Sequence, residues 1–193
     1  MAAFQSLVTA ANYPAVTLDS TMSTYRASAS FTPQATAAVT VISIQGSATR
    51  TVRIKRILLG GAATALSSTL FSMRKVSALG AGGTTVSPTI AELDTLSAAA
   101  TAVVSHYTAT LKAAGTDIDG PLSFFRLFQT TVTTPTVAYS DPQCIWPEKG
   151  FVGGQAIVLR GAAQYLEIQN ANAGNLAAGS VLDYSIEWVE DDS

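Results

Sequence analysis

The residues able to carry out acid–base, metal or nucleophilic chemistry are few in this chain. His106 is the only histidine, and no acidic or hydroxyl residue stands at a spacing that marks it as a catalytic partner. Asp117-Ile-Asp119-Gly120 has the first positions of a calcium-binding loop, but the third ligand and the bidentate Glu are missing. We therefore expect a turn at Asp119-Gly120 and no catalytic or metal-binding role for His106.

The remaining chemical candidates are one thiol and a few aromatic rings. Cys144 has no basic neighbour to favour its thiolate, so we expect a packed thiol. Trp146, Phe151 and Tyr139 would stack on a sugar if exposed, whereas buried rings would close the end of the fold. Trp188 belongs to the last predicted strand, and we expect it in the core. With no catalytic, cofactor or metal constellation, the sequence predicts that the protein is not an enzyme.

Composition and charge exclude several other classes of function. The chain has 193 residues and a net charge of -2, and its basic residues are scattered rather than gathered into the stripe that a phosphate backbone requires. Only 12% of residues are charged while 48% are apolar. Such a neutral surface is expected where other subunits cover it, although an ordinary small-residue β-domain stays an open alternative.

The sequence contains no targeting or membrane segment that we recognise. Met1 is followed by Ala-Ala-Phe-Gln-Ser, without a basic region or a continuous apolar core, and no stretch approaches the roughly 18 apolar residues of a membrane span. A single cysteine cannot form an internal disulfide. We expect synthesis in a reducing cytoplasm, and neither membranes nor nucleic acid as partners.

Alternating apolar and polar residues predict an all-β fold. Ala156 to Leu159, between glycines, has the composition of a central strand buried on both faces. Thr51 to Leu59 and Val181 to Val189 alternate with a period close to two, as strands do when one face meets water. Further strands are expected within 21–30, 37–45, 66–76, 98–111, 122–134 and 164–169. About nine strands at even spacing predict a β-sandwich of jelly-roll type.

Local signals predict how some of these strands connect. Residues 37–45 and 51–59 flank a turn and are expected to pair as an antiparallel hairpin. Ser87 to Asp94 has a capping residue, Pro88 at the first helical position and acidic residues soon after, which predicts a short helix. Gly115 to Pro121 is predicted to be a turn, and Glu190 to Ser193 a solvated terminus.

The first 20 residues differ from the rest. They carry large apolar side chains, including Phe4, Leu7, Val8 and Tyr13, without the period of a helix or strand. Disordered tails are depleted in such groups. We therefore expect residues 1–20 to form an arm and residues 21–193 a single β-sandwich domain. The arm packs either on its own sheet or, as we hypothesise, on a neighbouring subunit through these four side chains.

Several short motifs resemble a group of small virion proteins of tailed bacteriophages. They are Val52-Arg-Ile-Lys-Arg-Ile57 before Gly60-Gly61, the loop Gly82-Gly-Thr-Thr85, Ala156-Ile-Val-Leu-Arg-Gly161, and Ser180 to Val189 with its Ile-Glu-Trp ending. The resemblance covers about residues 50–190 and leaves the arm outside it.

The resemblance implies a β-sandwich subunit of a bacteriophage particle, of the head decoration or cement type. Such a protein clamps the major capsid protein on the capsid exterior, often as a homotrimer, and needs no cofactor. The alternative is a carbohydrate-binding or receptor-binding module of a tail or head fibre, with Trp146, Phe151 and Tyr139 as stacking groups. A hydrolase ranks a distant third.

Overall fold

The computed structural model describes residues 23–33, 39–63, 65–108, 112–129, 140–147, 156–171, 176 and 179–192. Within these residues the chain contains twelve strands and no helix. They are β1 (Ser23–Phe31), β2 (Val39–Gln45), β3 (Arg50–Ala62), β4 (Ser67–Ala78), β5 (Thr85–Val86), β6 (Ile90–Glu92), β7 (Val103–Tyr107), β8 (Thr116–Gln129), β9 (Ser140–Trp146), β10 (Ile157–Arg160), β11 (Tyr165–Asn170) and β12 (Val181–Asp192).

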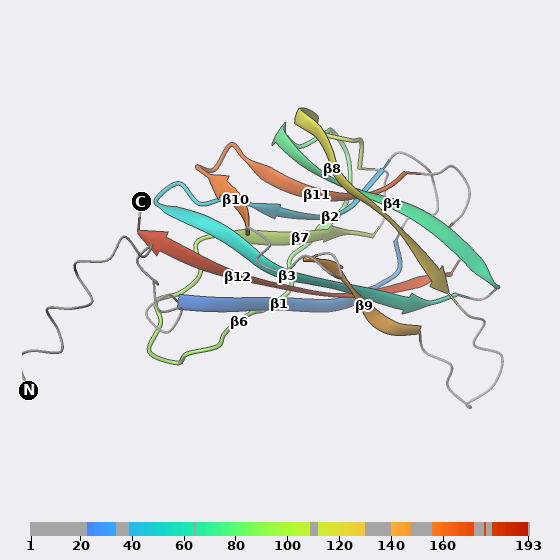
Figure 1. Ribbon diagram of the computed structural model, residues 1–193, viewed down its shortest axis with the longest axis horizontal. Helices are drawn as coiled ribbons and strands as arrows, with labels where there is room; N and C mark the ends of the chain where they lie inside the picture. The colour runs from blue at the N-terminus through green and yellow to red at the C-terminus, as the bar shows by residue number, and fades with distance from the viewer. Residues whose placement is uncertain are drawn as a thin grey trace, which may run out of the picture.

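The strands form two antiparallel sheets that pack face to face (Figure 1). The first has the order β10-β3-β12-β1-β6, with β9 also paired to β3, and the second the order β5-β7-β2-β11-β4-β8. The long-range pairs β1 with β12, β2 with β11, β3 with β10 and β4 with β8 are those of a long hairpin rolled up on itself. This is the pairing scheme of a jelly roll, so the predicted fold class is confirmed.

One apolar core fills the space between the sheets. The alternation of β12 points Leu182, Tyr184, Ile186 and Trp188 inward, and each is at most 4% exposed. The second sheet meets them with side chains such as Ile42, Phe71, Met73, Leu127, Leu166 and Ile168. Burial of this kind is the main stabilising contribution in a fold that, among its described residues, has no disulfide.

The chain between β4 and β8 is an addition to the eight paired strands. Its three short strands extend both sheets on the same side, because β6 pairs with β1 and β7 pairs with β2. Beyond β7, Ala113 forms an isolated antiparallel bridge with Val39 at the edge of β2, where the N–H of Thr40 donates to the carbonyl of Lys112 (2.9 Å). On the outer face of the second sheet, the N–H of Gly115 donates to Glu167 Oε2 (3.0 Å). We call the chain from Gly80 to Gly115 the insertion.

The predicted helix from Ser87 to Asp94 is wrong. Residues Ile90–Glu92 form β6, in which Ile90 lies opposite Ala27 and Glu92 opposite Tyr25. Pairing with an otherwise open sheet edge overrides a local helix-start signal that covers only two turns. This strand, β5 and β9 account for the difference between about nine expected strands and the twelve observed.

The prediction that residues 156–159 form a central strand is also wrong. Among the described strands β10 pairs only with β3, at an edge of the first sheet. Ile157 and Leu159 face the core, whereas Val158 is half-buried and Arg160 exposed. A run of four apolar and β-branched residues therefore does not require burial on both faces. Central positions in this sheet belong to β3, β12 and β1.

The predicted hairpin of residues 37–45 with 51–59 does not form, because β2 and β3 belong to different sheets. The connection between them crosses from one sheet to the other, and Ser47 Oγ accepts the N–H groups of Thr49 (3.1 Å) and Arg50 (3.0 Å) there. A bulge opposite Glu187 and Trp188 then places Ile57 on the same core face as Ile54 rather than on the opposite one.

The predicted turn from Gly115 to Pro121 lies largely inside β8. The pairing of β8 with β4 shifts register there, since Ser123 faces Met73 while Asp117 faces Val76. Gly120 absorbs the irregularity with a φ of 81°, in a left-handed region that side chains disfavour. The turn residues therefore mark a bulge within one long strand.

Candidate functional site

The single histidine is a core residue. His106 is 5% exposed, its ring stacks on Phe31 with 4.4 Å between centroids, and its Nδ1 lies 3.1 Å from the hydroxyl of Tyr184. Burial lowers the pKa of His106 below its ordinary value of 6.5. Burial likewise raises the pKa of Tyr184. Among the described residues no carboxylate is bonded to the pair, and the contacts of His106 are those of a packed core side chain.

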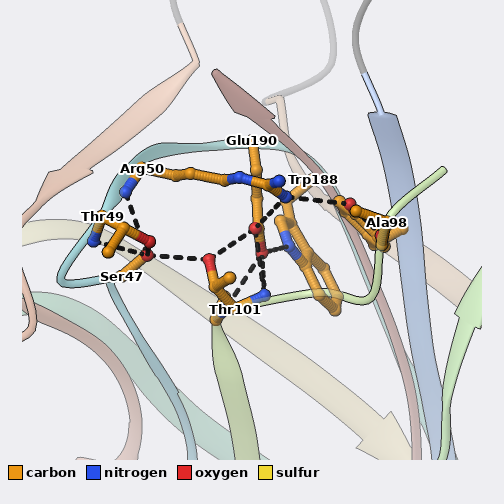
Figure 2. A network of polar contacts seen from close by, with 9 residues as sticks. Ser47, Thr49, Arg50, Ala98, Thr101, Trp188 and Glu190 are labelled. Carbon is orange, nitrogen blue, oxygen red and sulfur yellow. Dashed lines mark hydrogen bonds and ion pairs between the residues drawn. The ribbon is translucent and has the colours of Figure 1, made fainter. Parts of the chain in front are cut away.

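The densest polar cluster surrounds Glu190, near the end of β12 (Figure 2). Its Oε1 accepts the N–H of Ala102 (2.9 Å), the N–H of Thr101 (3.0 Å) and the indole N–H of Trp188 (3.0 Å). Its Oε2 accepts the hydroxyl of Thr101 (2.6 Å) and lies 3.5 Å from Nη1 of Arg50. We call this cluster the Glu190 network.

The Glu190 network fastens the insertion to the two strand ends beside it. Ser47 Oγ, on the connection between the sheets, lies 2.7 Å from Thr101 Oγ1. The hydroxyl of Tyr25 donates to the carbonyl of Ala98 (2.7 Å), and its ring stacks on Trp188. Four parts of the chain that are far apart in sequence, at residues 25, 47–50, 98–102 and 188–190, therefore meet in this network.

Burial alone would raise the pKa of Glu190, but the hydrogen bonds from Thr101, Ala102 and Trp188 outweigh it and hold that pKa below 4.5. A carboxylate with both oxygens engaged has no spare acceptor for a substrate proton. The network is therefore structural, and the predicted solvated terminus is wrong at Glu190. Alternation along β12 is the sequence signal that could have predicted burial of Glu190, since residue 190 shares a face with buried Trp188 and Ile186.

A second polar cluster lies on the outer face of the second sheet, beneath the insertion. Glu167 is fully buried, and its Oε2 accepts from Gly115 N–H (3.0 Å) and from Gln169 Nε2 (2.7 Å). Arg74 forms an ion pair with Asp117 and donates to Gln169 Oε1 (3.3 Å). Asp117 thus neutralises the neighbouring Arg74.

The thiol and the tryptophans of the described residues have packing roles. Cys144 is half-buried and its Sγ lies 3.2 Å from the carbonyl oxygen of Trp146, as expected for a packed thiol. Trp146 is half-buried against the core, and Trp188 is fully buried. Phe151 and Tyr139 lie outside the described residues, as do all four predicted partner-binding residues, Phe4, Leu7, Val8 and Tyr13.

Apart from Leu66, the exposed large apolar side chains of the described residues lie in two places. Four lie on the insertion: Val86, Leu93, Leu96 and Val103, of which Leu96 is 92% exposed. Four others lie on β8: Ile118, Leu122, Phe124 and Phe128, with both phenylalanines close to 60% exposed. The sequence does not identify these residues as surface groups, because alternation alone does not say which face of a strand is outward.

Among the residues that the structure describes, no group of three or more His, Cys, Asp and Glu side chains is arranged to hold a metal ion. The same residues include no helix long and apolar enough to cross a membrane. Comparisons with models of protein families, with characterised proteins and with solved structures find no match for this chain.

Proposed function

We propose that this protein is a non-enzymatic structural protein of a bacteriophage particle, a decoration protein that binds the major capsid protein on the outside of the shell. Jelly rolls occur in viral capsid and lectin domains, which supports the proposal by analogy of fold. Three of the four motifs that resemble tailed-phage virion proteins lie on β3, β10 and β12, which are adjacent strands of the first sheet, and the fourth, Gly82 to Thr85, lies in the insertion.

The main support for the proposal is a contrast within the insertion between its base, Thr101 and Ala102, which is anchored by hydrogen bonds, and its apolar tip at Leu96. Thr101 and Ala102 are bound to the buried Glu190, while Leu96, five residues before Thr101, is 92% exposed. The N–H of Leu96 donates to Asp94 Oδ1 (3.0 Å), which shapes the tip. A fixed apolar tip on a weakly charged protein is suited to adhesion by burial against another protein.

Repetition would make such modest contacts effective. Each subunit that covers on the order of 800 Å² of its partner adds one standard interface, and a closed shell repeats that interface many times. The arm residues Phe4, Leu7, Val8 and Tyr13 are the other proposed contacts, either with the capsid or between the three copies of a homotrimer.

The test is cryo-electron microscopy of phage particles purified from cells that carry the gene, with antibody labelling to identify the protein. We expect density for this jelly roll at repeated positions over the outer shell. Density confined to a tail or fibre tip would favour receptor binding, and particles without the protein would contradict the virion role. Truncation of residues 1–18 and the single change Leu96→Lys, each in separate particles, would show which contact governs occupancy.

A carbohydrate-binding role has a weaker basis. Lectin domains also use jelly rolls, but Trp146 packs against the core instead of presenting its face to solvent. A glycan array with the full chain separates the two proposals, since capsid decoration requires no signal on any sugar.

A further inference from the structure

The outer edge of β8 has the composition of a surface that another strand covers. Among the described strands β8 pairs only with β4, so it forms one end of the second sheet (Figure 1). Leu122 to Phe128 contains no proline, glycine or lysine and one charged residue. Sheet edges are usually protected by such residues or by bulges, and the bulge here, at Gly120, protects only the preceding part of the strand.

Side chains alternate cleanly along this part of β8. Leu127 is 1% exposed and Phe125 packs on the core, where it stacks on Phe71. Leu122 and Phe124, in contrast, are 42% and 58% exposed, and Phe128 is 59% exposed. The neighbouring strand places Ser68 opposite Phe128 and Ser72 opposite Phe124, so small side chains leave both rings open to contact.

The buried end of β8 is held in place. Gln129 is fully buried, its Nε2 donates to the carbonyls of Ala62 and Val181 (both 3.2 Å), and its Oε1 accepts from Ser67 (3.0 Å). These bonds tie the edge of the second sheet to β3 and β12 of the first. The exposed row of side chains formed by Leu122, Phe124 and Phe128 is therefore held in a defined orientation, which lowers the entropic cost of binding.

We propose that β8 pairs with β8 of a second copy of this chain, antiparallel, with a two-fold axis at Phe125. In this register Leu122 faces the partner's Phe128, and Phe124 faces the partner's Arg126. The exposed face then consists of apolar–aromatic and cation–aromatic pairs, both of which stabilise neighbouring strands. Moving the axis to Arg126 would oppose two arginines, a like-charge pair that destabilises a sheet.

The size of the row indicates a reversible contact. Each phenylalanine offers roughly 120 Å² of exposed surface, and with Leu122 the row supplies about 300 Å² per copy. A stable interface buries about 800 Å² per partner, so backbone pairing along the edge must contribute the remainder. The contact is isologous, so it joins two copies of the chain, or two copies of any oligomer that the chain forms through other surfaces. It does not depend on the proposed capsid role.

Sedimentation equilibrium of the full chain over a range of concentrations tests the contact, and two substitutions at one exposed position test its register. Phe124→Lys places a positive charge against the partner's Arg126 and should weaken association at least about tenfold. Phe124→Glu places a negative charge there and should weaken it much less. The double change Phe124→Lys with Arg126→Glu reverses the pair and should restore association.

Two controls separate this contact from other causes. Leu96→Lys introduces the same charge at an exposed apolar position on the insertion and should leave association through β8 unchanged. Circular dichroism should show each variant folded, since Phe124 lies outside the core. Equal losses for Phe124→Lys and Phe124→Glu, or no rescue by the charge swap, would overturn the register.

Amide hydrogen exchange measures the strand edge directly. The amides of residues 122–128 that point away from β4 should become protected as concentration rises, in step with the sedimentation mass. A chain that sediments without β8-dependent association, or whose β8 amides are protected equally at every concentration, would overturn the proposal, and the latter result would assign the edge to a segment of the same chain.

Discussion

Two glutamates are buried among the described residues of this protein, and they differ in how their oxygens are satisfied. Both oxygens of Glu190 accept hydrogen bonds, and Arg50 lies beside them. Glu167 uses only Oε2, while its Oε1 accepts no hydrogen bond from any described residue. Burial alone therefore does not make a carboxylate an anchor.

The difference follows from what surrounds each side chain. Glu190 lies where the N–H groups of Thr101, Ala102 and Trp188 converge, and these donors would lose this acceptor without it (Figure 2). Glu167 lies beneath the insertion, where Arg74 is already paired with Asp117. Removing the first leaves several buried donors without this acceptor, whereas neutralising the second removes an incompletely compensated buried charge.

The largest effect is expected from Glu190→Ala. It should lower the free energy of unfolding by about 3 to 5 kcal/mol, the usual cost of breaking a buried charge network. In a domain of this size that corresponds to roughly 10 °C in melting temperature. Urea unfolding measures the change.

Glu190→Gln should be the milder change, since it retains an acceptor, and Glu92→Ala on exposed β6 is the matched surface control. Equal stability of Glu190→Ala and Glu92→Ala would contradict the anchoring role.

A smaller decrease in the free energy of unfolding is expected at acid pH. Because burial lowers the pKa of His106, the unfolded chain binds its proton first, and stability should fall as pH drops below 6.5. The lowered pKa of Glu190 adds a second loss, present as stability above pH 4.5 and removed as pH falls through the folded-state pKa. Glu187 acts in the same direction, since its pKa is held down by Arg56 and Arg26 despite burial.

Thermal melts across this pH range separate the two stages. In His106→Gln, the loss of stability below pH 6.5 should become small, while the loss below pH 4.5 should remain. In Glu190→Gln, much of the loss below pH 4.5 should disappear. A wild-type protein whose stability does not change between pH 7 and 5 would show that His106 is not desolvated as the structure indicates.

The fold class was accessible from sequence because alternation reports burial of one face, and β4 and β12 were predicted on that basis. The sheet to which a strand belongs was not accessible. β2 and β3 follow one another as hairpin strands do, yet Ile42 pairs beside Ile168 in one sheet and Ile54 beside Trp188 in the other. Alternation is the same in both cases, because each sheet buries one face against the same core.

The Glu190 network could be anticipated only in part. Parity along β12 places Glu190 on the inward face, but its donors Thr101 and Ala102 lie in the insertion, nearly half the chain away. No local pattern predicts that meeting. The predicted turn at Asp119-Gly120 failed for a related reason, since a glycine inside a long strand and a glycine in a hairpin turn have the same local sequence signal.

The smallest effect is expected from Glu167→Gln, which tests the other half of the comparison. The amide oxygen can take over both hydrogen bonds now made by Oε2, from Gly115 and Gln169, and the change removes a charge from a site with no solvent contact. The amide NH2 that replaces Oε1 has no acceptor among the hydrogen bonds of the described residues, which offsets the gain from removing the charge. The free energy of unfolding should therefore change by less than about 1 kcal/mol. Urea unfolding beside Glu190→Gln measures both changes under one set of conditions. If Glu167→Gln lowers the free energy of unfolding as much as Glu190→Gln does, the charge of Glu167 itself is required. Arg74 would then be compensated by Glu167 as well as by Asp117.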